Sequence, residues 1–203
     1  MPCDKKKPIK SVAPGCFTGG MPELALPTTA VQRSFLAAMA EYRAEGRGGP
    51  DDNSMIGTEY RTFGATWESA AGFAAYVDAL RAASLEETRR PAGIVPSTTW
   101  WYVDGLDYLG RIALRHRLTD HLLEVGGHIG YDVRPSARRN GHATAMLRLV
   151  LPEARVLGID SALLTCDVDN VGSRTVIESA GGVLEDERGG KLRFWVPTLT
   201  RVG

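Results

Sequence analysis

RPSARRNGHAT, residues 134–144, places three arginines and one glycine directly before an apolar stretch with helical spacing. The apolar residues of that stretch, from Ala143 to Leu157, fall on one stripe of a helix. Such a segment fits a solvated surface turn, a patch for nucleic-acid phosphates, or a pocket for one small polyphosphate. The rest of the chain decides between these three interpretations.

The segment has the form of a strand–loop–helix anion site. A strand is expected to end at Val133, the loop contains Gly141, and a helix is expected to start near His142. The first amides of a helix lack internal partners and carry partial positive charge, and a glycine lets the backbone approach a phosphate closely. Residues 133–152 contain no acidic residue. These features favour a phosphate or pyrophosphate ligand.

The composition indicates a soluble protein without a broad basic surface. At 203 residues the chain is expected to form one domain, residues 23–203, after a loose lead-in over residues 1–22. The 24 Lys and Arg balance the 24 Asp and Glu, so we expect no nucleic-acid partner. No apolar run approaches the roughly 20 residues that span a bilayer, and no secretory signal is visible. We therefore expect no membrane association and a cytoplasmic location.

The cysteines and a tryptophan pair are interpreted as structural. Cys3, Cys16 and Cys166 are too few and too scattered for a disulfide framework or a zinc site, so we predict no metal. Cys166 lies in an apolar run and is expected to be a buried core residue rather than a nucleophile. Trp100 and Trp101 could wall a substrate cleft, although alternation along a strand places at least one of them in the core.

Periodicity along the chain predicts an α+β (mixed α/β) fold with helices on both faces of one sheet. We expect Thr29 with Gln32 and Thr66 to cap the first two helices, and Pro152 to kink or shorten the third. The expected elements, in chain order, are helices over 29–46 and 68–85, strands over 97–104, 108–118 and 126–133, a helix over 142–157, a strand over 159–168, a helix over 170–181 and a terminal hairpin over 182–197.

Two motifs resemble one protein family. Residues 138–143, RRNGHA, match the [Q/R]-x-x-G-x-[G/A] signature of the GNAT superfamily of acyl-CoA-dependent N-acyltransferases. Residues 166–182, CDVDNVGSRTVIESAGG, resemble the family's strand 5 to helix 4 segment, here with Asn170, Ser173 and Gly181. Both motifs occur in the family's strand–helix order, and the resemblance covers residues 97–197. The chain is similar to a bacterial subgroup of that superfamily.

The resemblance implies a mostly antiparallel GNAT-like sheet with helices on both faces, whose strands 4 and 5 splay apart to hold acetyl-CoA. The amides of residues 139–144 would bind the pyrophosphate, and the main chain of Tyr131 and Val133 would pair with the pantetheine arm like an added strand. The predicted cofactor-binding residues are Tyr131, Asp132, Val133, Arg138, Arg139, Asn140, Gly141, His142, Ala143, Thr144, Asn170 and Ser173.

The family resemblance also implies direct attack of a neutral amine on the thioester, without a covalent intermediate. A main-chain amide near Val133 would stabilise developing negative charge on the thioester oxygen. We predict Glu124 or His128 as the general base; a solvated carboxylate and a half-buried, hydrogen-bonded ring are the alternatives. Family members often carry a tyrosine acid seven residues after the asparagine. This chain has Ile177 there, which leaves the acid unassigned and Ser173 as a weak substitute.

The predicted function is transfer of acetyl from acetyl-CoA to a primary amine of a small molecule. Asp51, Asp52 and Glu59 fall in the expected acceptor region and favour a cationic acceptor. An aminoglycoside-like antibiotic, which would imply antibiotic resistance, a polyamine and a basic amino-acid derivative all fit. A peptide or protein amine, and a non-catalytic CoA-binding module favoured by Ile177, stay open as alternatives. The protein is expected to be a monomer or a homodimer.

Overall fold

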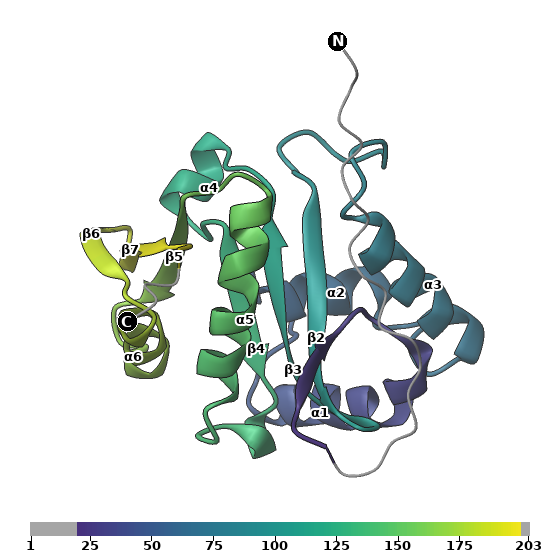
Figure 1. Cartoon of the computed structure of the whole chain (residues 1–203). Coiled ribbons are helices and arrows are strands. Elements are labelled where there is room, and N and C mark those ends of the chain that lie inside the picture. The colour runs from purple at the N-terminus through teal and green to yellow at the C-terminus, as the bar shows by residue number, and fades with distance from the viewer. Residues whose placement is uncertain (1–19, 200–203) are drawn as a thin grey trace.

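The computed structural model describes residues 20–199 (Figure 1). Its elements alternate between helices and strands much as the periodicity predicts. In chain order they are β1 Glu23–Ala25, a 3₁₀ turn Thr29–Val31, α1 Gln32–Ala44, α2 Met55–Phe63, α3 Ala70–Ala82, β2 Ser97–Asp104, β3 Asp107–Arg115, α4 Asp120–Glu124, β4 Ile129–Val133, a 3₁₀ turn Pro135–Ala137, α5 His142–Val156, β5 Ser161–Asp167, α6 Val171–Ser179, β6 Val183–Arg188 and β7 Lys191–Pro197.

The strands form two sheets rather than one. β1-β2-β3-β4 make the first sheet and β5-β7-β6 the second, and each of their ladders is antiparallel. β4 and β5 face each other between the sheets, and among the described residues no ladder joins them. The two strands are connected at one end, through His128, the residue directly before β4. There His128 N donates to Leu163 O of β5 (2.7 Å), and Leu163 N donates to His128 Nδ1 (2.9 Å). The expected splaying of strands 4 and 5 is confirmed.

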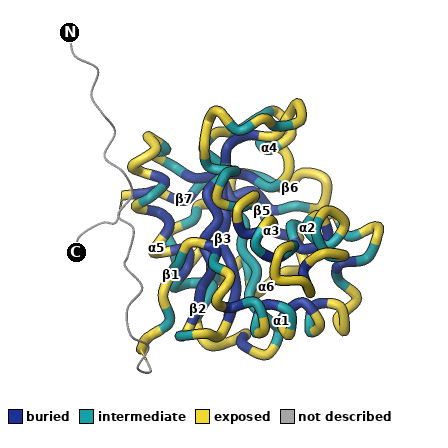
Figure 2. Tube along the Cα trace, turned by 90° about the vertical axis from the view of Figure 1, so that its right-hand side faces the viewer, coloured by how far each residue is buried: buried dark blue, intermediate teal, exposed yellow. Residues whose placement is uncertain are grey.

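Helices cover both faces of the first sheet. α5 packs on one face of β3 and α1 on the other, because successive side chains of a strand point to opposite faces. Trp100 enters the core beneath α5 and Trp101 enters the core beneath α1–α3, so both tryptophans are structural and neither walls a cleft. Figure 2 shows β3 as a buried strand in the middle of the molecule.

The core beneath α1–α3 is aromatic and holds these helices against the sheet. The Phe35 ring lies 5.1 Å from that of Trp67, edge to face, and 5.4 Å from that of Trp101, stacked. Burying one such ring stabilises the fold by about 1.5–3 kcal/mol, and a well-oriented ring pair adds about 0.5–1.5 kcal/mol. This packing fixes the position of α2, which forms one wall of the candidate site.

Several details differ from the sequence-based expectation. The first helical segment is capped by Thr28 rather than Thr29, and α3 is capped by Ser69 rather than Thr66. Helix α5 continues through Pro152 to Val156. Pro152 is exposed, so the carbonyl that loses its helical partner faces water and the helix is not shortened.

Three elements were not predicted: β1, α2 and α4. α2 follows a stretch rich in glycine, proline and aspartate that is typical of a loop, and its start is capped by the Ser54 hydroxyl, which accepts from Gly57 N at 3.2 Å. Most of the predicted lead-in, residues 1–22, lies outside the described residues. No helix within residues 20–199 is long and apolar enough to cross a membrane.

Candidate active site

Two of the three arginines that follow β4 attach this loop to α1. Arg134 Nε donates to Glu41 Oε1 at 2.7 Å, and Arg138 makes a two-pronged contact with Glu45 at 2.8 Å on each prong. Arg139 has no hydrogen-bond or ion-pair partner among residues 20–199. It is also their only non-glycine residue with positive φ, at 63°. The loop therefore keeps one cationic side chain available to an anion.

The start of α5 is open. Gly141 is the N-cap residue with φ 78° and ψ 2°, and no side chain caps the helix. A Cβ built on Gly141 would find no atom within 4 Å. The amides of the first helical turn consequently face free space, which suits a phosphate group.

A cavity of about 590 Å³ extends from this helix start to α6, and we call it the loop cavity. All predicted cofactor-binding residues line it except Asn140, whose side chain instead donates to Ala137 O at 3.2 Å. Asn170 caps α6 by accepting from Ser173 N at 2.9 Å. Residues far apart in the sequence, from the loop after β4 and from the start of α6, thus form the two walls of one cavity.

The free edge of β4 faces the second sheet. Arg134 N donates to Leu109 O at 2.8 Å, and Asp132 pairs with Arg111 in the ladder with β3. Backbone groups of alternate residues in an antiparallel strand point to opposite sides. The N–H and C=O groups of Tyr131 and Val133 therefore point away from β3, toward the gap.

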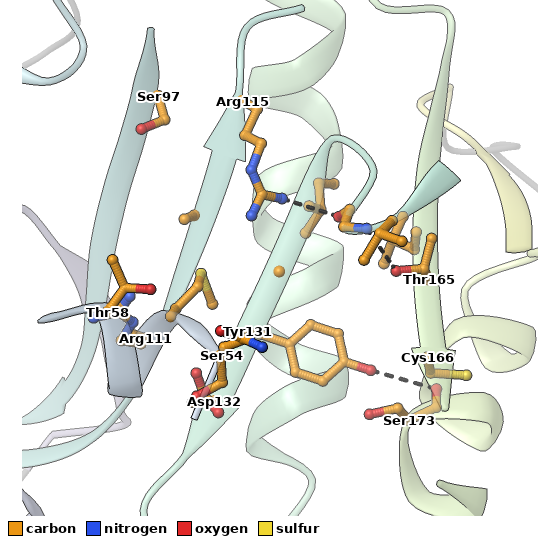
Figure 3. A pocket seen from close by; sticks show the side chains of 18 of the residues that line it. Ser54, Thr58, Ser97, Arg111, Arg115, Tyr131, Asp132, Thr165, Cys166 and Ser173 are labelled. Carbon is orange, nitrogen blue, oxygen red and sulfur yellow. Dashed lines mark hydrogen bonds between the residues drawn. The ribbon is translucent and has the colours of Figure 1, made fainter. Parts of the chain in front are cut away.

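A second cavity, of about 500 Å³, lies on the face of β2, β3 and β4 that α2 covers, and we call it the sheet cavity. The two cavities meet at residues that line both. These shared residues are Arg47, Tyr131, Asp132, Asn170 and Ser173. Figure 3 shows the sheet cavity, with Arg111 and Arg115 of β3 on one side and Cys166 of β5 on the other.

The carboxylates of the sheet cavity are paired within the protein. Glu59 accepts from Arg111, and Tyr76 donates to the same oxygen at 2.5 Å. Burial disfavours the charge of Arg111, but Glu59 beside it outweighs this effect and raises the pKa of Arg111. Asp132 pairs with Arg47 at 2.7 Å. The third carboxylate that lines the cavity, Asp167, pairs with Lys191.

The acids expected to attract a cationic acceptor do not do so in this geometry. Glu59 is neutralised by Arg111, and neither Asp51 nor Asp52 lines the sheet cavity. Asp52 accepts from Gly48 N (2.7 Å) and Ser54 N (2.9 Å). Burial opposes its ionisation, but these bonds outweigh burial and lower the pKa of Asp52. Its charge organises the turn before α2.

Neither predicted base lines the loop cavity or the sheet cavity. Glu124 is half exposed at the end of α4 and pairs with Arg188 at 2.8 Å, away from the β4 edge. His128 is buried, and its Nδ1 accepts from Leu163 N. Burial, and secondarily the charge of Arg115, lowers the pKa of His128 to about 4, so the ring is neutral at pH 7. This geometry fits the alternatives for both residues better than the role of base: Glu124 forms a surface ion pair, and His128 joins the two sheets.

The junction of the cavities contains a phenol that the sequence did not single out as an acid. Tyr131 OH spans the gap and donates to Ser173 O at 3.3 Å (Figure 3). Burial raises the pKa of Tyr131 to about 12, so its proton stays in place. Ile177, at the family's tyrosine position, is a buried core residue. Cys166 is buried too, and burial raises its thiol pKa, which disfavours a thiolate.

Among the described residues, Asp132 is the one carboxylate that lines both cavities. Its side chain is only 11% exposed and reaches the junction that the two cavities share. The sequence prediction included Asp132 only as a cofactor-binding residue. A polar residue at alternate spacing from Gly130 on β4 was the available signal, because it places the carboxylate on the α2 face of the sheet.

The comparison with protein families identifies the class. The sequence model of the family described as Acetyltransferase (GNAT) domain matches residues 58–183, more than half of the chain. The chain therefore belongs to the GNAT acetyltransferase family. This membership confirms the expected family, fold and class of enzyme, an acetyl-CoA-dependent N-acetyltransferase. No curated protein sequence matches the chain.

Solved structures share the fold at low identity. The microcin C7 self-immunity acetyltransferase MccE, in complex with acetyl-CoA and AMP, matches with TM-score 0.57 and 12% identity over 86% of this chain and 91% of its own. RimJ of Mycobacterium smegmatis, in complex with CoA-disulfide, matches with TM-score 0.58 and 15% identity over 87% of this chain and 85% of its own. The PaiA N-acetyltransferase of Thermoplasma acidophilum, in complex with coenzyme A, matches with TM-score 0.53 and 12% identity over 88% of this chain and 99% of its own.

Proposed function

We propose that the protein transfers the acetyl group of acetyl-CoA to a primary amine of a small molecule, with acetyl-CoA in the loop cavity and the amine in the sheet cavity. The observation that carries this proposal is the junction of the two cavities at Tyr131, Asp132 and Ser173. Two ligands that enter from opposite sides of the β4 edge would meet there, which is the requirement for direct transfer between them.

The residues of the loop cavity fit a coenzyme A ligand. The open amides after Gly141 and the unpaired Arg139 would hold the pyrophosphate. The backbone groups of Tyr131 and the N–H of Val133, which point toward the gap, would hydrogen-bond the pantetheine amides and the thioester carbonyl; the Val133 carbonyl already accepts from Arg138 Nε at 3.3 Å. When bound, acetyl-CoA supplies an activated thioester whose acetyl group is transferred and whose thiolate leaves.

Asp132 is the group that we assign to proton removal. An amine enters the cavity as an ammonium ion and must lose a proton before it attacks. Asp132 Oδ1 is held by Arg47, and no described residue hydrogen-bonds Asp132 Oδ2. That oxygen can accept the ammonium proton directly or through one water molecule. Arg47 orients the carboxylate toward the junction.

Tyr131 is the group that we assign to the leaving side. Its hydroxyl keeps its proton and lies at Ser173, in the first turn of α6. The family's usual tyrosine, one turn further along this helix, is replaced by Ile177. The phenol can release its bond to the Ser173 carbonyl and donate to a departing thiolate. The hydroxyl of Ser173, which the sequence suggested for this role, lies beside it at the same junction.

A small-molecule acceptor is favoured over a protein by the size of the sheet cavity. Its volume of about 500 Å³ falls in the range of about 300–1,000 Å³ typical of small-ligand sites. A peptide acceptor would need an extended groove that leads away from the junction. The non-catalytic alternative loses its main support, because Tyr131 supplies a phenol although position 177 does not.

The test is a thiol-release assay in which acetyl-CoA is mixed with the protein and with either small primary amines or peptides that have a free N-terminus. We expect CoA release with at least one small amine, and an N-acetylated product of that amine by mass spectrometry. Release only with peptides would move the acceptor to proteins. CoA binding by calorimetry without release for any amine would indicate a non-catalytic module.

A further inference from the structure

Arg115 on β3 is the one cation of the sheet cavity that no carboxylate within residues 20–199 neutralises. The other three cations of that cavity each pair with one of its three carboxylates. Arg115 Nη1 donates to the backbone oxygens of Gly126 (2.9 Å) and Gly127 (3.0 Å). Its Nε and Nη2 have no hydrogen-bond partner among the described residues. The cavity therefore carries one uncompensated positive charge.

The chemistry of this charge selects a carboxylate. Burial, and secondarily the charge of Arg111, lowers the pKa of Arg115, yet an arginine stays protonated at pH 7. Arg115 is half-buried, so its charge is partly shielded from water without a carboxylate beside it, and a ligand that supplies the counter-charge gains affinity. The free edge formed by Nε and Nη2 matches the two oxygens of a carboxylate. A phosphate dianion would leave the cavity with excess negative charge.

The position of Arg115 relative to Asp132 limits the length of the ligand. A Cβ built on Gly130 would lie 3.9 Å from Arg115 Nη1 and 3.1 Å from Met55 Cε, so the guanidinium lies above a residue without a side chain. Gly130 and Asp132 are alternate residues of β4 and share one face, about 7 Å apart along the strand. Figure 3 shows both charged groups beside this cavity. A ligand that bridges them has its two polar ends only a few bonds apart.

The geometry points to a small amino acid as the acceptor, with its carboxylate on Arg115 and its amine toward Asp132. This inference rests on the proposed acetyl transfer and names its substrate class, in place of the cationic antibiotic or polyamine that the sequence favoured. The reaction forms an amide N–C bond and breaks the thioester C–S bond. Of the two protons that the ammonium nitrogen loses, one passes through Asp132 to water and the other ends on the thiol.

The test compares each common L-amino acid, and β-alanine, with its matched carboxamide in the thiol-release assay, with spermidine as an amine without a carboxylate. In the unaltered protein we expect kcat/KM for the best amino acid to exceed that for its amide roughly 10- to 100-fold. Arg115→Gln should remove this ratio by lowering the amino-acid value alone. Arg115→Lys should retain part of it. Arg117→Gln, on an exposed residue paired with Glu86, should keep the full ratio.

The outcomes separate this inference from the proposed function. Turnover of amides or spermidine as fast as of amino acids would overturn the inference and keep the acetyl transfer. Equal losses for amino acid and amide in Arg115→Gln would assign Arg115 a structural role and also overturn it. Absence of turnover with every amine would overturn the proposed function. In that case the carboxylate site is tested by calorimetry, with N-acetylglycine and N-acetyl-β-alanine titrated into the CoA-loaded protein. Binding that Arg115→Gln abolishes supports the carboxylate site. Absence of binding to the unaltered protein overturns it.

Discussion

The loop cavity and the sheet cavity share their junction, yet they are built in opposite ways. Apart from Arg47, the loop cavity is lined by two short segments, residues 131–144 and 170–176, and most of the contacts that we assign to the cofactor there are made by backbone groups. The sheet cavity takes its lining from residues 47–191, and it offers charged side chains that compensate one another except at Arg115. A ligand common to a whole family can be held by the main chain, whereas an individual acceptor needs side chains.

The sharpest test of this difference is removal of the Asp132 carboxylate. Asp132 lies on β4, which lines both cavities, and its carboxylate is assigned to the acceptor in the sheet cavity. Asp132→Asn should lower kcat roughly 10²- to 10⁴-fold, because the ammonium loses its proton acceptor. Acetyl-CoA affinity measured by calorimetry should stay within a few-fold, since none of the contacts assigned to the cofactor is made by the Asp132 carboxylate. The residual rate should rise with pH as more free amine forms in solution.

Asp104→Asn is the matched control, because Asp104 is exposed in the β2–β3 turn and lines neither cavity. Its kcat should be unchanged. An Asp132→Asn enzyme that keeps full activity would mean that bulk water takes the proton. The side chains of the sheet cavity would then have no role in proton removal.

The loop cavity is tested at Gly141. Gly141→Val should weaken acetyl-CoA binding at least tenfold, about 1.4 kcal/mol, because the branched side chain would fill the space in front of the helix amides. Gly158→Val offers a close control at the other end of α5: its φ is +84° against +78°, and it too has no atom within 4 Å of a built Cβ. Both variants should lose similar stability, but only Gly141→Val should lose affinity. Equal affinity in the two variants would remove the anion site.

Tyr131 tests the junction itself. Tyr131→Phe should lower kcat by roughly tenfold, the value of one hydrogen bond to a charged group, and should change the KM for acetyl-CoA little. Tyr102→Phe, on a residue buried in the core beneath α5 and outside both cavities, should have no such effect on kcat. A Tyr131→Phe enzyme with an unchanged kcat would leave the leaving thiolate without an acid from this protein.

The smallest expected effect concerns His128, which joins the two sheets at the end of the gap. Its pKa falls from 6.5 to about 4 on folding, so the unfolded chain binds more protons between these values. The free energy of unfolding should therefore decrease as pH falls from 6.5 to about 4. His128→Gln should make that decrease shallower in urea titrations, and the exposed His121→Gln should not. Equal slopes in all three proteins would mean that His128 is not buried as a neutral ring.

The wall of the loop cavity that follows β4 could be predicted from the sequence because its chemistry is local. The arginines, the glycine and the helix start all lie within residues 134–144, and the β2–β3 hairpin is marked by Asp104 and Gly105. The backbone conformation of such a segment follows from neighbouring residues, so a short motif suffices.

The sheet cavity could not be predicted, because it depends on contacts between distant residues. Glu59 and Arg111 are 52 residues apart, and α2, which carries Glu59, is only nine residues long and follows a segment typical of a loop. Glu124 and His128 were proposed as bases for their closeness to β4 in sequence, but the chain turns at Gly126 and Gly127, both with positive φ, between them. Arginines on an apolar strand, as in β3, were the available signal for a charged cavity.

A crystal structure with bound coenzyme A tests the central claim most directly. We predict the pyrophosphate within hydrogen-bond distance of the amides of residues 139–144, the pantetheine along the free edge of Tyr131 and Val133, and the thiol at the junction beside Asp132 and Tyr131. Coenzyme A bound with its pyrophosphate elsewhere, or with its thiol turned away from the sheet cavity, would contradict the account.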